Sequence, residues 1–331
     1  MSSPSDPGSL TRRRLLLGAG ALATGSVAAV GAQRAGLLQP RAQVAAFSVA
    51  SYGADLVDLL TRGLREFPDT AARIPGARVV LKPNFVEFSP LRPVNTNPLL
   101  VAAAVEAFRG LGAREVTVAE GPGHCRDTEL IGEQSGLSEQ LALVGAPFVD
   151  LNADVFRQVR LARNFTGRGT LPIAGTILGA DLVVSMPKLK THHWAGVTLS
   201  MKNLFGTVPG QAFGCPKNPL HWAGINQSIV DLWLAIKPGF AIVDGIVGME
   251  GDGPIRGDAV NMGVIVMGDQ CPAVDATAAR LMGVDPEQLA YLEAAGRLGG
   301  TIAAHRIEHI GDEVAPRTFV LGARFGGPTA G

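Results

Sequence analysis

The chain has 331 residues, of which 47% are hydrophobic and 18% charged. This composition excludes a disordered chain and predicts a folded protein with a full hydrophobic core. Because 29 basic residues balance 29 acidic ones, no overall field attracts the protein to nucleic acid, and any anion binding must be local.

The N-terminal segment has the pattern of an export signal. Thr11-Arg12-Arg13-Arg14-Leu15-Leu16 precedes a run of apolar and small residues that extends from Leu17 to Ala32. A charged region followed by an apolar one is typical of a cleavable signal, and paired arginines before two leucines resemble the twin-arginine type, which exports folded proteins. We therefore expect residues 1–32 to be a twin-arginine-type signal peptide, the export machinery to be a partner, and the mature protein to be periplasmic or otherwise extracytoplasmic. The alternative is an uncleaved signal that anchors the protein in the membrane.

The rest of the chain alternates apolar strands with helices. We predict strands at 43–48, 77–81, 115–119, 148–151, 182–186, 240–243, 262–267 and 306–310, and helices at 54–66, 99–109, 128–135, 137–144, 221–236, 272–282 and 286–298. Residues 152–178 are irregular, with room for a small hairpin or a lid. Continuous apolar strands that alternate with helices predict one α/β domain over residues 33–331, with a largely parallel sheet covered by helices on both faces.

Polar side chains follow four of the predicted strands at the point where each strand ends. They are Lys82 with Asn84, then Glu120, then the block from Lys188 to His193, and finally Asp244 with Glu250. Because the carboxyl ends of parallel strands lie along one edge of a sheet, we expect these groups to converge on one pocket.

The segment Asp181–Gly206, DLVVSMPKLKTHHWAGVTLSMKNLFG, carries most of this chemistry. We predict that its strand breaks at Pro187 and releases the lysines and histidines into a loop, before Lys202 and Asn203 lead to Gly206. A solvated basic loop with two incidental histidines is the alternative.

The lysines indicate an anionic ligand. Those expected around the pocket are Lys82, Lys188, Lys190 and Lys202. Clustered ammonium groups repel one another unless an anion or nearby carboxylates offset them, which favours a phosphate or carboxylate ligand hydrogen-bonded by Asn84 and Asn203. A lysine crowded by other lysines has a lowered pKa and can act as a base or nucleophile. In the alternative interpretation, each lysine pairs with an acid in a structural network.

No motif identifies a metal or a cofactor. His192 and His193 are adjacent, so in an extended chain they point to opposite sides and cannot both reach one ion. Cys125, Cys215 and Cys271 form neither a CxxC pair nor a ferredoxin-type run, so no iron–sulfur motif is present locally. GxxxxGK[ST], GxGxxG and a serine nucleophile elbow are also missing from the sequence.

Three separated motifs, KPN after the second strand, PKLKTH…KNLFG, and VDGIVGMEGDGP, resemble the domain of unknown function 362 family over roughly Val79 to Asp285. The positions that match that family's pattern are Lys82, Asn84, Lys188, Lys190, Thr191, His192, Lys202, Asn203, Gly206, Asp244, Glu250, Gly251, Gly253 and Pro254. Many members of the family carry a ferredoxin-like cluster domain, whose cysteine runs this sequence lacks. A fainter resemblance is to the N-terminal domain of nickel-pincer lactate racemases, in the order of His192, Lys202 and Pro209-Gly210.

The sequence therefore predicts an exported α/β protein with a lysine-rich pocket for an anionic substrate or cofactor. The candidate catalytic residues are Lys202, His192 and Glu250. The candidate binding residues are Lys82, Asn84, Lys188, Lys190, Thr191, Asn203, Gly206, Asp244, Gly251 and Gly253. A non-catalytic small-molecule or cofactor-binding protein, and a redox partner whose cofactor is loaded before export, are the alternatives.

Overall fold

The computed structural model describes residues 42–123 and 127–322. The expected signal peptide at residues 1–32 and Cys125 lie outside these ranges. Within them, no helix is long and apolar enough to cross a membrane.

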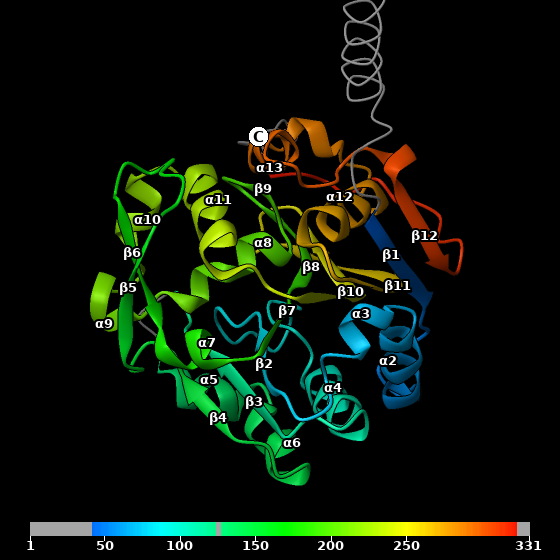
Figure 1. The fold of residues 1–331 in the computed structure, drawn as a ribbon. Coiled ribbons are helices and arrows are strands. Elements are labelled where there is room, and N and C mark those ends of the chain that lie inside the picture. The colour runs from blue at the N-terminus through cyan, green and yellow to red at the C-terminus, as the bar shows by residue number, and fades with distance from the viewer. Residues whose placement is uncertain (1–41, 124–126, 323–331) are drawn as a thin grey trace, which may run out of the picture. The chain divides into compact units, whose positions relative to one another are not determined.

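One large sheet runs through the described chain (Figure 1). Its strands follow the order β12 (Ile307–Gly311), β1 (Ala42–Ser48), β11 (Asp258–Gly268), β10 (Phe240–Glu250), β7 (Leu182–Met186), β2 (Arg78–Pro83), β3 (Glu115–Glu120) and β4 (Phe148–Asp150). Strand β11 is antiparallel to β1 and β10, and the other neighbours along this path are parallel. The predicted α/β fold with a largely parallel sheet is confirmed.

Helices cover both faces of this sheet. The helices of the described chain are α2 (Leu56–Arg65), α3 (Pro68–Ala71), α4 (Pro98–Gly110), α5 (Thr128–Gln134), α6 (Leu137–Leu143), α7 (Gly175–Gly179), α8 (Ser200–Asn203), α9 (Gly210–Phe213), α10 (Asn218–Trp222), α11 (Ile225–Ile236), α12 (Cys271–Leu281) and α13 (Ala290–Arg297). Alternate strand residues face opposite sides, so Val79 and Leu81 join the buried cluster of α2 and α4, whereas Val80 joins that of α11 to α13. The central apolar runs, such as β2 and β7, are therefore strands buried on both faces, whereas β4 and β12 at the two ends of the sheet are largely exposed.

The loop predicted after Pro187 is a strand, so that prediction was wrong. Residues Lys188–His192 form β8, which pairs parallel to β10 and antiparallel to β9 (Gly196–Thr198), and every residue of β8 is buried. The prediction failed because β10 does not end at Val243. It continues to Glu250 alongside β11, so the edge of β10 that pairs with β7 extends further and pairs with β8.

Two predicted helices are each interrupted. The segment predicted as one helix at 221–236 is divided by Gly224, whose φ of 93° ends α10 and begins α11. A 3₁₀ turn at Pro286–Gln288 precedes α13 instead of one continuous helix. In the region predicted to be irregular, β5 (Phe156–Arg160) and β6 (Thr170–Ala174) form a two-stranded antiparallel hairpin.

A buried ion pair joins β8 to β10. Lys188 Nζ lies 2.9 Å from Asp244 Oδ2, and both side chains are almost completely shielded from solvent. Lys188 Nζ also donates to the Tyr52 hydroxyl, which in turn donates to Asp244 Oδ1. The backbone N–H of Asn97, the N-cap of α4, donates to the same carboxylate. This network ties the loop before α2 and the start of α4 to the centre of the sheet.

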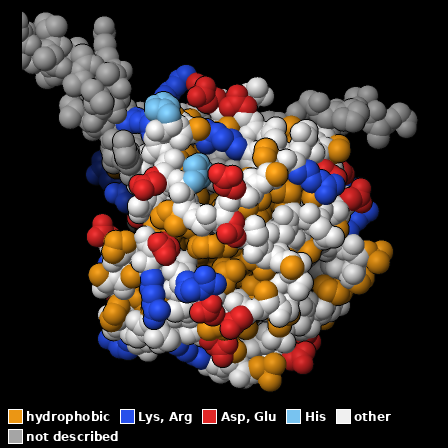
Figure 2. Space-filling model, turned by 90° about the vertical axis from the view of Figure 1, so that its right-hand side faces the viewer, with side chains coloured by type: hydrophobic (Ala, Val, Ile, Leu, Met, Phe, Trp, Pro, Cys, Tyr) orange, Lys and Arg blue, Asp and Glu red, His pale blue; other side chains and the backbone are white. Residues whose placement is uncertain are grey.

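Charged side chains of both signs are mixed over the face seen in Figure 2, with hydrophobic side chains between them. This mixture accords with the balance of 29 basic and 29 acidic residues in the chain.

Replacing Asp244 by asparagine should lower the free energy of unfolding by about 3 kcal/mol or more, because it leaves the Lys188 ammonium buried without its counter-charge. Denaturant unfolding measures the change. The matched control is Asp181→Asn, which removes the exposed partner of Arg78 and should cost far less. If the two variants lost the same free energy of unfolding, burial would not be the reason why the Lys188–Asp244 pair stabilises the fold.

Candidate functional site

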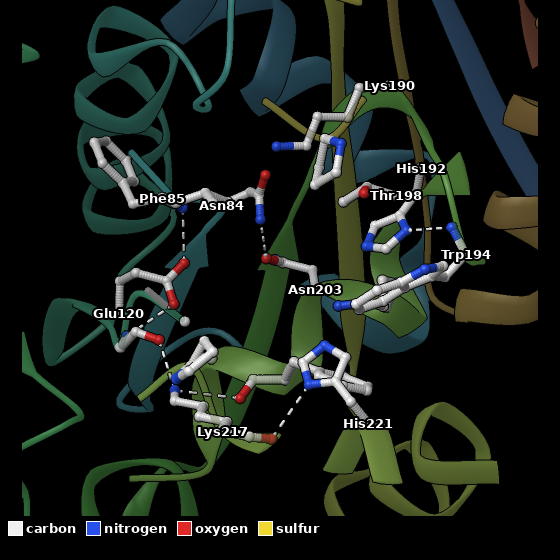
Figure 3. Close-up of a pocket in the computed structure, with 18 of the residues that line it drawn as sticks. Asn84, Phe85, Glu120, Lys190, His192, Trp194, Thr198, Asn203, Lys217 and His221 are labelled. Carbon is white, nitrogen blue, oxygen red and sulfur yellow. Dashed lines mark hydrogen bonds between the residues drawn. The ribbon is translucent and has the colours of Figure 1, made fainter. Parts of the chain in front are cut away.

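A cavity of about 190 Å³ lies where β2, β3 and β8 end (Figure 3). Helix α8 and the segment before α10 complete its wall. The charged and titratable side chains that matter for its chemistry are Lys82, Lys190, Lys202, Lys217, Glu120 and His192. Four of the six lysines in the chain therefore line one small cavity.

Lys82 and Glu120 form the floor of the cavity. They end the adjacent parallel strands β2 and β3, which brings the Lys82 ammonium 2.7 Å from Glu120 Oε2, with both side chains buried. Lys82 Nζ also donates to Asn203 Oδ1 at 3.0 Å and to the Pro83 carbonyl at 2.8 Å. Burial lowers the pKa of Lys82, while the Glu120 carboxylate opposes that shift. With three acceptors around it, this ammonium is a fixed structural charge.

Lys190 and Lys217 are held by backbone carbonyls. Lys190 Nζ donates to the Val94 carbonyl at 2.6 Å, and Lys217 Nζ donates to the Gly121 carbonyl at 2.7 Å. Burial lowers the pKa of Lys190 well below its ordinary value, and the charges of Lys202 and Lys188 add to the effect. Burial also lowers the pKa of Lys217 to about 7.

Lys217 is not among the site residues predicted from the sequence. It lies in the Gly/Pro-rich segment 209–219, where Pro216 precedes it and its own φ is 61°. The sequence signal that could have identified it is a single lysine among clustered glycines and prolines. Such segments form turns, and a turn can direct a side chain into the interior of the protein.

Lys202 differs from the other three lysines. Its Nζ lies 3.7 Å from the centre of the Phe205 ring, a cation–π contact, and no described residue offers it a hydrogen-bond acceptor or a carboxylate partner. Burial, together with the ammonium groups of Lys82 and Lys217, lowers its pKa to about 7. Near neutral pH this amine therefore exists in both its protonated and its neutral form.

Helix α8, which carries Lys202 and Asn203, is held at its first turn by a buried carboxylate. Asp275 of α12 accepts hydrogen bonds from the backbone N–H groups of Ser200 at 2.7 Å and of Met201 at 3.0 Å. A carboxylate at this end of a helix satisfies N–H groups that have no partner within the helix. Asp275 thereby sets the direction in which Lys202 leaves the helix.

His192 presents a neutral imidazole to the cavity (Figure 3). Its Nδ1 accepts hydrogen bonds from the backbone N–H groups of Trp194 and Ala195 at 3.1 and 3.3 Å. A nitrogen that accepts cannot carry the proton, so the proton resides on Nε2. Burial lowers the pKa of His192 well below its ordinary value, and the charge of Lys202 adds to this. The ring is therefore a neutral N–H donor.

The two adjacent histidines both line the cavity, with ring centres 5.0 Å apart. The extended backbone for which the sequence places them on opposite sides is not present at this point, because β8 ends at His192 and the chain turns there. Among residues 42–123 and 127–322, no group of three or more His, Cys, Asp and Glu side chains is arranged to hold a metal ion.

Six of the sequence candidates lie outside the cavity lining, namely Lys188, Thr191, Asp244, Glu250, Gly251 and Gly253. Lys188 and Asp244 pair with each other, and the Thr191 hydroxyl donates to the Gly251 carbonyl. Glu250 accepts a hydrogen bond from the Val320 N–H at 2.9 Å and lies 3.9 Å from Arg317, so its carboxylate holds the segment that follows β12. The remaining candidates line the cavity: Lys82, Asn84, Lys190, His192, Lys202, Asn203 and Gly206.

Fold and site together define an α/β protein with a lysine-lined pocket at the edge of a mostly parallel sheet. The chain belongs to the domain of unknown function family DUF362, whose model matches residues 79–280. It is 31% identical over 236 residues to a thylakoid-associated protein of Synechocystis sp., and this match covers 68% of the chain and 69% of the relative.

Two solved structures resemble the fold. One is the lactate racemase apoprotein from Thermoanaerobacterium thermosaccharolyticum, with 15% identity and a TM-score of 0.44 over 74% of this chain. The other is a protein from Thermotoga maritima, with 12% identity and a TM-score of 0.40 over 73% of this chain. The matched parts span 58% and 59% of those two chains, less than two thirds of each.

Replacing Gly206 by alanine should disturb the cavity floor. The added Cβ would overlap Glu120 Oε1 and come within 2.7 Å of Lys82 Nζ. We expect a loss of about 1–3 kcal/mol in the free energy of unfolding, as for other over-packed sites. Thermal and denaturant unfolding measure it. The matched control is Gly110→Ala at the end of α4, where a Cβ meets nothing within 4 Å. A Gly206→Ala variant as stable as this control would contradict the expected overlap.

Proposed function

We propose that the protein is an enzyme that binds a small anionic substrate or cofactor in the lysine-lined cavity. The excess of positive charge carries this proposal, because four lysines line the cavity and, among the described lining residues, Glu120 is the one carboxylate. Glu120 is one carboxylate among four lysines and pairs directly with Lys82, so it offsets only part of the charge of Lys190, Lys202 and Lys217. Charges so close together and so shielded from water favour an anion that neutralises them.

Lys202 and His192 are the groups that we assign to chemistry. An amine whose pKa is about 7 can accept a proton or attack a carbonyl carbon at neutral pH, and can return the proton in a later step. The His192 Nε2–H donates a hydrogen bond without carrying charge, which suits it to stabilise negative charge that develops on a substrate oxygen. Lys190 and Lys217, each fixed by a carbonyl, supply electrostatic attraction and orientation.

A non-catalytic binding protein is the second candidate, since the same charges would hold an anion without transforming it. A redox partner loaded with its cofactor before export is a further form of this alternative. Turnover of a bound compound supports the enzyme, whereas thermal stabilisation without turnover supports the binding protein.

We also propose that the protein is exported. The proposal rests on the Arg12-Arg13 pair with the apolar run behind it, and on similarity to a relative named as thylakoid-associated.

Replacing Lys202 by methionine should weaken binding of inorganic phosphate and of glycolate by more than about tenfold, because it removes a cation that has no competing acceptor in the described structure. Isothermal titration calorimetry measures the affinities. Lys237→Met is the matched control, since Lys237 is the exposed lysine at the end of α11. Unchanged affinity for both anions in a folded Lys202→Met variant would show that Lys202 does not bind the anion.

Anion affinity should be highest below about pH 7 and fall as the pH rises through it. The pKa values of Lys202 and Lys217 are both about 7, so each amine loses its charge above that pH. A bound anion favours the ammonium form and raises its pKa. The affinity therefore declines by up to about tenfold per pH unit for each amine that must take up a proton. Titrations with glycolate, a monoanion throughout this range, test the slope. An affinity that does not change with pH would contradict the prediction. In Lys202→Met, the slope of the logarithm of affinity against pH should be smaller by about one.

Replacing both Arg12 and Arg13 by lysine should keep the protein in the cytoplasm of a host that has twin-arginine export, since that pathway reads the arginine pair. Cell fractionation and immunoblotting measure the distribution. The control is Arg34→Lys, outside the pair, which should be exported as the parent is. Export of the double variant at the parental level would refute a twin-arginine signal.

A further inference from the structure

The side-chain amide of Asn203 has one allowed orientation. Its Oδ1 accepts a hydrogen bond from Lys82 Nζ at 3.0 Å, and its Nδ2 donates to the Lys82 carbonyl at 2.9 Å and to the Ser185 hydroxyl at 3.1 Å. An ammonium group can only donate and a carbonyl can only accept, so exchanging the nitrogen and oxygen of this amide would break both contacts with Lys82.

Asn203 in turn orients Asn84. Asn84 Nδ2 donates to Asn203 Oδ1 at 3.3 Å, so Asn84 Oδ1 must point away from Asn203, as Figure 3 shows. Asn84 is 8% exposed and lines the cavity, and its Oδ1 has no hydrogen-bond partner among the described residues. A buried carbonyl oxygen without a donor is unfavourable, and a ligand atom that donates to it would remove that cost.

The other polar groups of the cavity are mainly donors. Lys202 offers an ammonium that no described residue accepts from, and His192 offers Nε2–H. Among the buried side-chain atoms of the described cavity lining, Asn84 Oδ1 is the one fixed acceptor without a partner, and it lies among several donors. A ligand made only of acceptors would satisfy Lys202 and His192 and leave Asn84 Oδ1 buried and unpaired.

We propose that the ligand is a small anion that also carries an O–H or N–H donor beside its anionic group, and that Asn84 selects for that donor. This inference rests on the proposed function, because it concerns the same cavity. Hydrogenphosphate and 2-hydroxycarboxylates have both features, whereas sulfate and unsubstituted carboxylates have acceptors alone. Sites that hydrogen-bond one ligand group discriminate strongly against analogues that lack it, because a buried polar atom then stays unpaired.

Two matched pairs of probes test the selection by calorimetry on the full chain. Hydrogenphosphate and sulfate are compared at about pH 8, where both tetrahedral anions carry about two negative charges. Glycolate and acetate are compared at about pH 6, where both are monoanions. We expect the donor-bearing member of at least one pair to bind more than about tenfold tighter, and the pair that shows it identifies a phosphate or a carboxylate as the anionic group.

Two variants separate the role of Asn84 from a general effect on the cavity. Asn84→Leu keeps a similar volume and removes the acceptor, so the preference should fall to within about twofold. Thr198→Val is the control, because the Thr198 hydroxyl also lines the cavity without a partner among the described residues but can rotate to donate or to accept. It should change both affinities and keep their ratio.

The outcomes distinguish this inference from the proposed function. Equal affinities within both pairs for the parent protein would overturn the selection by Asn84 and leave the anion pocket standing. Binding of none of the four probes would overturn both. If Asn84→Leu does not fold, the affinity ratios measured on the parent protein still decide whether the cavity selects an anion that carries a donor. A preference that persists in a folded Asn84→Leu variant would overturn the assignment to Asn84.

Discussion

The removal of lysine side chains from water is the constraint on which the described structure depends. Lys82, Lys188, Lys190 and Lys217 are each at most 1% exposed. A buried ammonium is tolerated only when anions or carbonyls replace its hydration. Lys82 and Lys188 are satisfied by Glu120 and Asp244, and Lys190 and Lys217 by the carbonyls of Val94 and Gly121. These partners belong to segments far apart in the chain, so each lysine fixes a loop or a strand end to the sheet.

The way in which each buried lysine is neutralised distinguishes the lysines with a structural role from those proposed to bind a ligand. Lys188 and Asp244 neutralise each other within the fold, whereas the lysines of the cavity outnumber its carboxylates. Lys202 is the member whose amine contacts an aromatic ring in place of an acceptor. Its helix is anchored by Asp275, and the neighbouring His192 ring is oriented by two backbone N–H groups. Groups held in place before a ligand arrives need little reorganisation when charge develops, which is the condition for electrostatic stabilisation.

The described residues that line the cavity all fall between Lys82 and Pro254, inside the range 79–280 that the family model matches. Asp275, which positions α8, is also within that range, whereas β1 and β12 at one edge of the sheet lie outside it. The proposals about the cavity therefore concern the part of the chain that is shared with the family. A comparison among members of the family can address the same Lys202, His192 and Asn84 chemistry.

The sequence by itself determined the α/β alternation and the convergence of Lys82, Asn84 and Glu120, because apolar runs ending at Pro83 and at Gly121-Pro122 mark where parallel strands release polar groups. It also placed Lys202 and Asn203 together, since they are neighbours in the chain. Only the tertiary structure decided that β8 is a strand, that Lys188 and Asp244 neutralise each other, that Glu250 binds the C-terminal segment, and that Lys217 enters the cavity. The physical reason is that local sequence patterns show which residues are buried. The partner of a buried charge, however, depends on contacts between segments that are far apart in the sequence.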